Sequence, residues 1–302
     1  MFFPLLELDR EELNYNTLPG KEIIDKYTTN FPWFPPKMSC CPPNAEGFLA
    51  ANYSTKGALQ TLPSGLEFYL SGTGSKAILI IPDVFGWNGG RTRNIADMLA
   101  DAGYMVMIPK LMVPPLEGGT DGDGLFPDFS FEAHGAKFGP YMSQFAWEGN
   151  IQPKVSDCLG FLKSQGASSI GMLGFCWGGW VIAKALASED TSMTADVTCG
   201  AIAHPSVSIE AMLFQGDVGT IFSKICKPLL LMPAKGDPAE YHPGGAWFES
   251  LKKTCPASES ILFLEENHGF LSRGDIVASA ATKTAVDSAL AKVFAFYASN
   301  MG

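Results

Sequence analysis

The sequence predicts an α/β protein with a mostly parallel central sheet covered by helices on both faces. Short apolar runs rich in β-branched residues alternate with helix-like segments along most of the chain, and several of these runs are apolar at nearly every position. Near-continuous apolar strands are buried on both faces, which is typical of parallel sheets whose crossovers are helices. The chain has 302 residues, of which 46% are hydrophobic, so it can form one large domain of this kind.

The regular pattern begins at about residue 66. Strands are expected at 66–70, 77–82, 104–109, 170–175, 198–203, 228–233 and 260–264, and helices between them at 92–102, 155–165, 179–187 and 246–253. A last helix is indicated by a 3.6-residue stripe of Val286, Leu290, Val293, Phe294 and Tyr297. The longest irregular piece, 110–139, is rich in Gly, Pro and Asp, and a loop of this length is usually functional.

Residues 1–45 differ from the rest of the chain. The segment 11–27 favours a short helix broken at Pro19-Gly20, and the prolines of Phe31-Pro-Trp-Phe-Pro-Pro36 resist both helix and central strand. Its aromatic rings are poorly suited to a solvated tail. We therefore expect an arm that packs on its own domain or on a second copy, which leaves a monomer and a homodimer both open.

Composition excludes several classes of partner. The chain has 21 Lys and Arg against 31 Asp and Glu, a net charge of −10 that disfavours nucleic acid and anionic membrane surfaces. The longest uncharged apolar stretch, 170–183, is too short and too rich in glycine to span a bilayer. The N-terminus lacks the features of a secretory signal, and seven scattered cysteines do not suggest a disulfide framework. We expect a cytoplasmic protein that acts on a small molecule.

The sharpest local motif is Gly174-Phe-Cys-Trp-Gly-Gly179, which follows one predicted strand and precedes a helix. Small residues two before and two after Cys176 allow the tight strand-to-helix turn that presents a nucleophile above a sheet. The helix N-terminus beneath the thiol lowers its pKa. The alternative is an ordinary glycine-lined turn that holds a buried structural cysteine.

Partners for Cys176 occur in the order that this arrangement requires, which is nucleophile, acid and histidine. Asp237 follows the strand 228–233 and His268 follows the strand 260–264, and parallel sheets place their chemistry at these carboxyl ends. Cys176, Asp237 and His268 are therefore the candidate nucleophile, orienting acid and base. Chain order argues against His204 as the base, although it could line the pocket, and His242 is too close in sequence to Asp237.

The loop after the strand 77–82 is expected to complete an oxyanion site. The N–H groups of Val84 and Trp177 are the candidate donors. Asp83 is either a plain turn residue or a carboxylate that faces Cys176 and exchanges a proton with it. Aromatic side chains near these motifs suggest an aromatic-lined pocket, although Trp180 could equally belong to the core; they are Phe85, Trp87, Trp177, Trp180 and Phe270.

Together these motifs, with Asp83-Val-Phe-Gly-Trp87 and His268-Gly-Phe270 followed by Arg273-Gly-Asp275, resemble the dienelactone hydrolase family, and most closely its eukaryotic, fungal-like branch. The resemblance spans residues 38–300. It implies a single-domain, lidless α/β hydrolase that acts on lactones or enol esters through a cysteine, with no metal or other cofactor. Cys176, His268 and Asp237 occupy the triad positions, and Val84 and Trp177 the oxyanion-hole positions.

The resemblance has further implications for individual residues. Bacterial members have a glutamate at the place of Asp83, where it controls the charge of the thiol, and aspartate is one methylene shorter. Arg273 stands in for one of two arginines that hold the substrate carboxylate, and a second is not identified. The family core begins near Ser39–Pro43, so residues 1–37 are an extension before a domain at 38–302. Without further Cys or His nearby in the sequence, Cys40-Cys41 is a poor metal site, and a structural or solvent-exposed role is expected for the pair.

Three functional hypotheses follow. The first is a cysteine hydrolase that opens a lactone or activated ester through a thioester intermediate. The second is a hydrolase fold that has lost catalysis and binds a small molecule. The third makes Cys176 a redox sensor, for which the sequence reveals no resolving cysteine, although one could approach in space.

Overall fold

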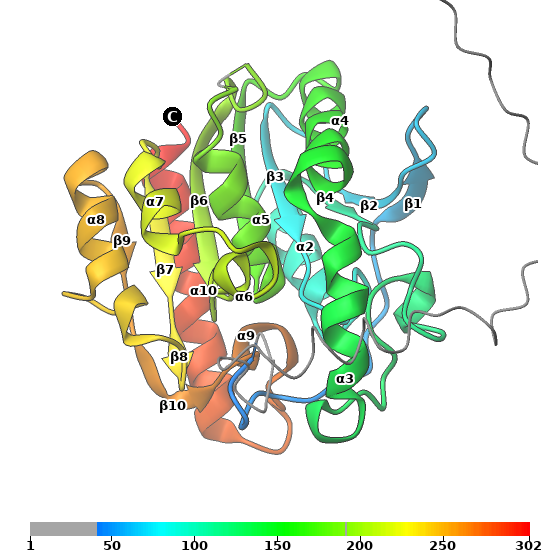
Figure 1. Ribbon diagram of the computed structural model, residues 1–302. Helices are drawn as coiled ribbons and strands as arrows, with labels where there is room; N and C mark the ends of the chain where they lie inside the picture. Colours follow the sequence, from blue (N-terminus) through cyan, green and yellow to red (C-terminus); the bar gives the residue numbers. More distant parts are fainter. Residues whose placement is uncertain (1–40, 191) are drawn as a thin grey trace, which may run out of the picture. The chain divides into compact units, whose positions relative to one another are not determined.

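The structure is a computed structural model that describes residues 41–190 and 192–302 (Figure 1). The predicted arm, the proposed extension 1–37 and Cys40 lie outside these described residues. An eight-stranded sheet has the order β1-β2-β4-β3-β5-β6-β7-β9, in which β1, β2 and β4 pair antiparallel and all other neighbours pair parallel. The strands are β1 (Ala58–Thr61), β2 (Glu67–Ser71), β3 (Lys76–Ile81), β4 (Met105–Pro109), β5 (Ser169–Phe175), β6 (Val197–Ala203), β7 (Leu229–Met232) and β9 (Glu259–Ser260). The predicted class, an α/β protein with a mostly parallel sheet, is confirmed.

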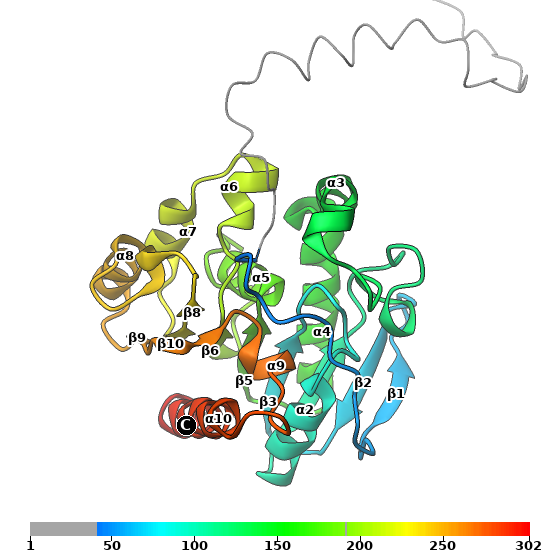
Figure 2. The same cartoon turned by 90° about the horizontal axis from the view of Figure 1, so that it is seen from below.

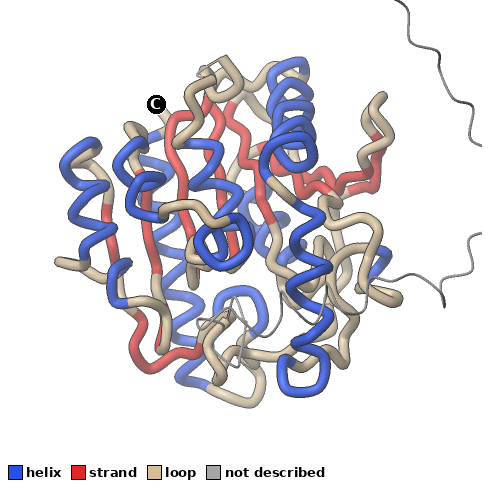
Figure 3. Tube along the Cα trace, viewed as in Figure 1, coloured by secondary structure: helices blue, strands red, loops and turns tan. Residues whose placement is uncertain are grey.

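Helices cover both faces of this sheet, as Figures 2 and 3 show. On one face lie α2 (Thr92–Asp101) and α10 (Ala280–Asn300), and on the other lie α4 (Gln152–Ser164) and α5 (Trp177–Leu186). The remaining helices are α3 (Phe131–Met142), α6 (Ile209–Phe214), α7 (Val218–Lys224), α8 (Ala246–Thr254) and α9 (Phe270–Arg273), and short helical turns occur at Thr120–Gly122, Ser143–Phe145, Trp147–Ile151 and Ala239–Tyr241. No helix within the described ranges is both long and apolar enough to cross a membrane.

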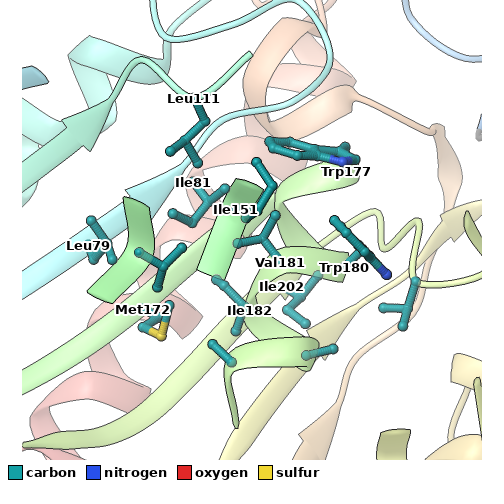
Figure 4. Close-up of a cluster of buried hydrophobic side chains, with 14 of the residues drawn as sticks. Leu79, Ile81, Leu111, Ile151, Met172, Trp177, Trp180, Val181, Ile182 and Ile202 are labelled. Carbon is teal, nitrogen blue, oxygen red and sulfur yellow. The ribbon is translucent and has the colours of Figure 1, made fainter. Parts of the chain in front are cut away.

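The central strands supply two separate cores because their side chains point alternately to opposite faces. In β3, Leu79 and Ile81 pack on the α4 and α5 side, whereas Ile78 and Ile80 pack on the α2 and α10 side. This explains why these strands are apolar at every position. Figure 4 shows the core on the α4 and α5 side, where residues of α5 such as Val181 and Ile182 lie over the sheet.

The structure differs from the predicted elements in several places. The single strand expected at 260–264 is two strands, since β9 ends the main sheet and β10 (Phe263–Asn267) pairs in parallel with the short β8 (Ala234–Lys235). The segment 110–139 is not irregular throughout, because α3 begins at Phe131, where the Ser130 side chain accepts a hydrogen bond from the N–H of Ala133. Pro140 lies inside α3 and weakens its sequence signal. The edge strand β1 and the short helices α6 and α7 were not expected.

The turn between β5 and α5 depends on close backbone approach. Cys176 has a φ of 53° and a ψ of −114°, a conformation that non-glycine residues rarely adopt. A Cβ at Gly178 would lie 2.2 Å from the carbonyl oxygen of Ile81, and one at Gly174 would lie 2.6 Å from the carbonyl oxygen of Gly178. The two glycines therefore let α5 start directly against β3 and hold Cys176 above the sheet.

Replacing Gly178 with alanine should lower the free energy of unfolding by about 3 kcal/mol, because the added methyl group meets backbone atoms of β3 that cannot rotate away. Urea denaturation measures this change. Gly160→Ala is the matched control, since Gly160 lies in α4 with no atom within 4 Å of an added Cβ. The control should be neutral or stabilising by up to about 1 kcal/mol. Equal effects of the two substitutions would contradict the steric argument.

Candidate active site

Cys176, Asp237 and His268 come together beyond the carboxyl ends of the strands. His268 Nδ1 lies 2.6 Å from Asp237 Oδ1, and a ring nitrogen of His268 lies within 4.8 Å of the Cys176 sulfur. All three residues are buried, Cys176 and His268 completely. The bond of Nδ1 to the carboxylate directs Nε2, the other ring nitrogen, away from Asp237 and leaves it as the proton-transfer atom for a reacting group.

Backbone contacts fix both partners of this hydrogen bond. Asp237 Oδ2 accepts a hydrogen bond from the N–H of Ala234 at 2.8 Å, so that Oδ1 is directed at His268. On the other side, the N–H of Glu46 donates to the carbonyl oxygen of His268 at 2.7 Å. The acid and the imidazole are therefore held from separate segments and meet with a defined geometry.

The charges around His268 favour its protonated form. Burial alone lowers the pKa of the imidazole, but the electrostatic influence of Cys41, Asp237 and Cys176 outweighs burial and holds the pKa well above its usual range. A positively charged imidazole next to a thiol stabilises the thiolate. The raised pKa thus keeps His268 positively charged close to Cys176.

The predicted oxyanion donors are the N–H groups of Val84 and Trp177. Val84 follows β3 and Trp177 is the first residue of α5, and both are buried in the same core as Cys176. Within the described residues, neither backbone N–H donates a hydrogen bond to another protein group. Buried N–H groups are nearly always satisfied in folded proteins, so these two unused donors are compatible with the predicted oxyanion site.

Asp83 and Arg273 form a buried ion pair. Asp83 Oδ2 accepts hydrogen bonds from Arg273 Nη1 and from the hydroxyl of Ser272, and Oδ1 accepts from the N–H of Phe85 at 2.9 Å. Arg273 Nε donates to the carbonyl oxygens of Glu46 and Gly47. The guanidinium is 2% exposed and its charge is neutralised. The expected contact of Arg273 with a substrate carboxylate finds no support in this arrangement, and Asp83 is more than a plain turn residue.

The expected aromatic pocket is divided between the two cores. Phe85 and Trp177 share the core of Cys176. Trp87 and Phe270 belong to the core on the α2 and α10 side, where the Arg93 guanidinium lies 4.7 Å from the centre of the Trp87 ring. In this structure Trp87 and Phe270 are therefore core residues, and the expectation that they contact substrate is not supported.

His204 lies behind His268, with 5.0 Å between the ring centres. It also packs against the rings of Phe175 and Phe270, and both of its ring nitrogens lack a hydrogen-bond partner in the part of the chain that the structure describes. Burial, together with positive charge at His268 and Arg273, holds the pKa of His204 well below its usual range, so its ring is neutral. Its ring packs against the ring of His268 and supports its orientation, and the expectation that His204 lines the pocket stays a prediction.

Sequence reasoning missed two side chains that contact the nucleophile. The Cys41 sulfur lies 3.5 Å from the Cys176 sulfur, and the Ser206 hydroxyl lies 3.3 Å from it. Cys41 is only 5% exposed, so the expected solvent-exposed role is wrong, whereas a structural role stays a prediction. The only signal in the sequence was the position of Cys41 at the start of the family-like core.

Cys41 begins a segment, residues 41–49, that we term the strap. Figure 2 shows its blue trace passing the end of the sheet near α9. The N–H of Glu46 donates a hydrogen bond to the carbonyl oxygen of His268. The carbonyl oxygens of Glu46 and Gly47 accept hydrogen bonds from the Arg273 side chain. The carbonyl oxygen of Leu49 accepts one from the N–H of Gly90 at 2.7 Å. The strap therefore crosses the catalytic end of the sheet and is fixed there by backbone hydrogen bonds.

Three potential metal ligands meet at this point. The sulfurs of Cys41 and Cys176 and a ring nitrogen of His268 all lie within 4.8 Å of one another. Two thiolates and an imidazole are ligands that zinc accepts. The argument from sequence against a metal at Cys41 assumed that no further ligands were near, and that assumption is wrong in space.

The site is closed to solvent in this structure. A cavity of about 440 Å³ lies elsewhere, between α5, α7 and the turn at Trp147, and its lining includes Lys184, Glu210 and Lys224. Since Cys176 and His268 are completely buried, a substrate reaches them only after a covering segment moves.

Solved structures share this architecture. An esterase of Pyrococcus furiosus matches 86% of the chain and 99% of its own length with a TM-score of 0.55 at 15% identity. A Klebsiella pneumoniae protein proposed to be a dienelactone hydrolase matches 82% of the chain and 99% of its own length with the same TM-score at 13% identity. At such identities the likeness concerns the fold. With its strand-to-helix turn at Cys176, this fold is that of the α/β hydrolases.

Sequence comparison is more specific. The model of the dienelactone hydrolase family matches residues 68–300, and the chain belongs to this family. The human protein named carboxymethylenebutenolidase homolog is 28% identical over 218 residues, 71% of this chain and 78% of its own length. The hydrolase TropI of Talaromyces stipitatus is 28% identical over 253 residues, 80% and 88% of the two chains. The protein is accordingly a hydrolase of carboxylic esters or lactones.

Replacing Asp83 with alanine should lower the free energy of unfolding by about 3 to 5 kcal/mol, because it leaves the buried Arg273 charge without its partner. Urea denaturation measures the change. The exposed pair of Lys283 and Asp287 provides the control, and Asp287→Ala should cost at most about 0.5 kcal/mol. An Asp83→Ala variant as stable as this control would contradict the assigned role of the ion pair.

The neutral, buried His204 should make the protein sensitive to mild acid. The imidazole of the unfolded chain takes up a proton as the pH falls below 6.5, whereas the folded form, with its lowered pKa, does not. His204 therefore stabilises the fold above pH 6.5, and this contribution is lost below it by about 1.4 kcal/mol per pH unit.

Urea denaturation of His204→Phe between pH 6.5 and 5.5 tests this, and the variant should lose stability less steeply than the wild type. Phe175→Leu, which trims an uncharged ring stacked on His204, should instead shift stability equally at each pH. An unchanged slope in His204→Phe would show that other groups cause the acid sensitivity.

Proposed function

We propose that the chain is a cysteine-dependent hydrolase that opens a lactone or an activated enol ester through a thioester acyl-enzyme. The observation that carries the proposal is the 2.6 Å contact between His268 and Asp237, with the imidazole facing a cysteine on a strand-to-helix turn. Nucleophile, base and orienting acid within reach of one another are the requirement for this chemistry.

In the proposed reaction the Cys176 thiolate attacks the substrate carbonyl carbon. The N–H groups of Val84 and Trp177 hold the resulting oxyanion. Collapse of the tetrahedral intermediate breaks the bond to the ring oxygen, and His268 donates a proton to the departing oxygen. The neutral imidazole then removes a proton from water, which attacks the thioester and releases the free acid.

The chemistry of the thiolate favours a particular substrate class. A thiolate is itself a good leaving group, so its tetrahedral intermediate returns to substrate unless the ester oxygen departs at least as readily. An enolate leaving group meets this condition because resonance spreads its charge. The name of the human relative refers to a methylene-substituted butenolide, and a double bond at the carbon that bears the ring oxygen makes the departing oxygen an enolate. The buried Arg273–Asp83 pair provides no free cation for a carboxylate, so the proposal does not require an anionic substrate.

The cytoplasmic location, the monomeric or homodimeric state and the boundary at residue 37 stay predictions of the sequence.

Replacing Cys176 with alanine should lower the rate of dienelactone hydrolysis by about a thousandfold or more, since the sulfur that forms the thioester in the proposed reaction is lost. Hydrolysis is followed by the loss of lactone absorbance, with p-nitrophenyl acetate as a second substrate. Cys226→Ala, at an exposed cysteine, is the matched control and should keep the wild-type rate. Equal rates for the wild type and Cys176→Ala on both substrates would favour a protein that only binds a small molecule.

Replacing Asp237 with asparagine should leave the protein folded and lower turnover by about three orders of magnitude, because the imidazole loses the carboxylate that orients it and stabilises its charge. The same substitution removes a negative charge that raises the pKa of His268. The limb of the pH–rate profile that reports the imidazolium should therefore move to lower pH. A variant with full turnover and an unchanged profile would remove Asp237 from the mechanism.

A further inference from the structure

The geometry at Cys41 extends the proposed function. Its sulfur lies 3.5 Å from the sulfur of Cys176, with both side chains buried. A disulfide requires a separation of about 2.05 Å, so the two sulfurs need to approach by only about 1.5 Å. The strap that carries Cys41 lies across the site and brings together two cysteines that are 135 positions apart in the sequence.

The surroundings favour thiol chemistry on both sulfurs. A ring nitrogen of His268 lies within 4.8 Å of each of them, so a small movement brings this base to either thiol. The Ser206 hydroxyl, 3.3 Å from the Cys176 sulfur, adds a hydrogen-bonding group beside the reacting atom. A nucleophilic thiolate next to a second thiol is the arrangement in which oxidation ends in a disulfide.

We propose that Cys176 and Cys41 form a reversible oxidation site, in which Cys176 reacts with a hydroperoxide and Cys41 resolves the product as an intramolecular disulfide. The proposal rests on the proposed function in so far as Cys176 is the reactive thiolate. The disulfide removes the nucleophile from hydrolysis and ties the strap over the site, so the oxidised protein is inactive until a thiol reduces it.

The reaction balances in two steps. The Cys176 thiolate attacks one peroxide oxygen, so that an S–O bond forms, the O–O bond breaks, and the departing alkoxide or hydroxide takes a proton from the His268 imidazolium. The Cys41 thiol then gives its proton to His268 and attacks the sulfur of Cys176. An S–S bond forms, the S–O bond breaks, and the oxygen leaves as water with that proton. One hydroperoxide is reduced and two thiols are oxidised.

The attack of Cys41 on the oxidised Cys176 sulfur determines whether oxidation of the protein is reversible. A cysteine sulfenic acid without a neighbouring thiol is oxidised further to sulfinic and sulfonic acids, which common thiols do not reduce. With Cys41 in contact, attack by the second sulfur competes with this further oxidation. Cys41 therefore protects the nucleophile as well as switching it off.

The test uses the full-length protein in a buffer containing a metal chelator. The protein is treated with a small molar excess of hydrogen peroxide, and the intact mass, the cross-linked peptides and the hydrolysis rate are measured before and after dithiothreitol. The wild type should lose two hydrogen atoms in mass, yield one peptide pair that joins Cys41 to Cys176, and recover its full activity on reduction.

The Cys41→Ala variant should hydrolyse substrate before treatment, then gain oxygen atoms at Cys176 and recover less than about a tenth of its activity with dithiothreitol. Cys226→Ala should behave as the wild type, and Cys40→Ala should still give the Cys41–Cys176 pair. Oxygen gain without cross-linking in the wild type would overturn the proposal. Equal recovery of the wild type and Cys41→Ala, or a cross-link through Cys40 alone, would also overturn it.

Because mass reports the disulfide independently of activity, the two proposals can fail separately. A Cys41–Cys176 cross-link in a protein that hydrolyses neither test substrate supports the oxidation site and counts against the hydrolase. Hydrolysis that requires Cys176, with no cross-link after peroxide, supports the hydrolase and overturns the oxidation site.

Discussion

The buried ion pair between Asp83 and Arg273 joins the segments on which the site depends. Asp83 belongs to the loop that carries the Val84 N–H, and Arg273 lies at the end of α9, a few residues after His268. Through its Nε, the same guanidinium holds the strap. Charges buried to this extent are stable only when they are paired and hydrogen-bonded. The pair therefore fixes the loop that carries Val84, the segment that follows His268 and the strap relative to one another.

A second constraint is steric and comes from the backbone. The start of α5 approaches β3 so closely that no side chain fits at Gly178. This approach brings the Trp177 N–H toward the loop after β3 and forces Cys176 into its positive-φ conformation. Strained residues of this kind persist only where the surrounding structure holds them, and such positions are common at active sites. The positions of the Cys176 side chain and the Trp177 N–H thus follow from one local contact.

Much of this arrangement could be predicted from the sequence because its signals are local. Continuous apolar runs indicated the parallel strands, and chain order after the Cys176 motif indicated Asp237 and His268. Contacts made by residues distant in the sequence gave no such signal. Nothing near Cys41 indicates that the strap brings it to Cys176, and nothing near Arg273 indicates that Asp83 neutralises it. The division of the last expected strand into β9 and β10 depends on pairing with β8, which is also non-local.

The complete burial of Cys176 has a consequence for measured affinity. A ligand that binds only an open form has an apparent dissociation constant equal to the intrinsic constant divided by the fraction of molecules that are open. Each backbone hydrogen bond that fixes the strap lowers this fraction. A high Michaelis constant would then reflect the free-energy cost of opening the site as well as poor complementarity to the substrate. Loosening the strap could tighten apparent binding without adding a single contact to the substrate.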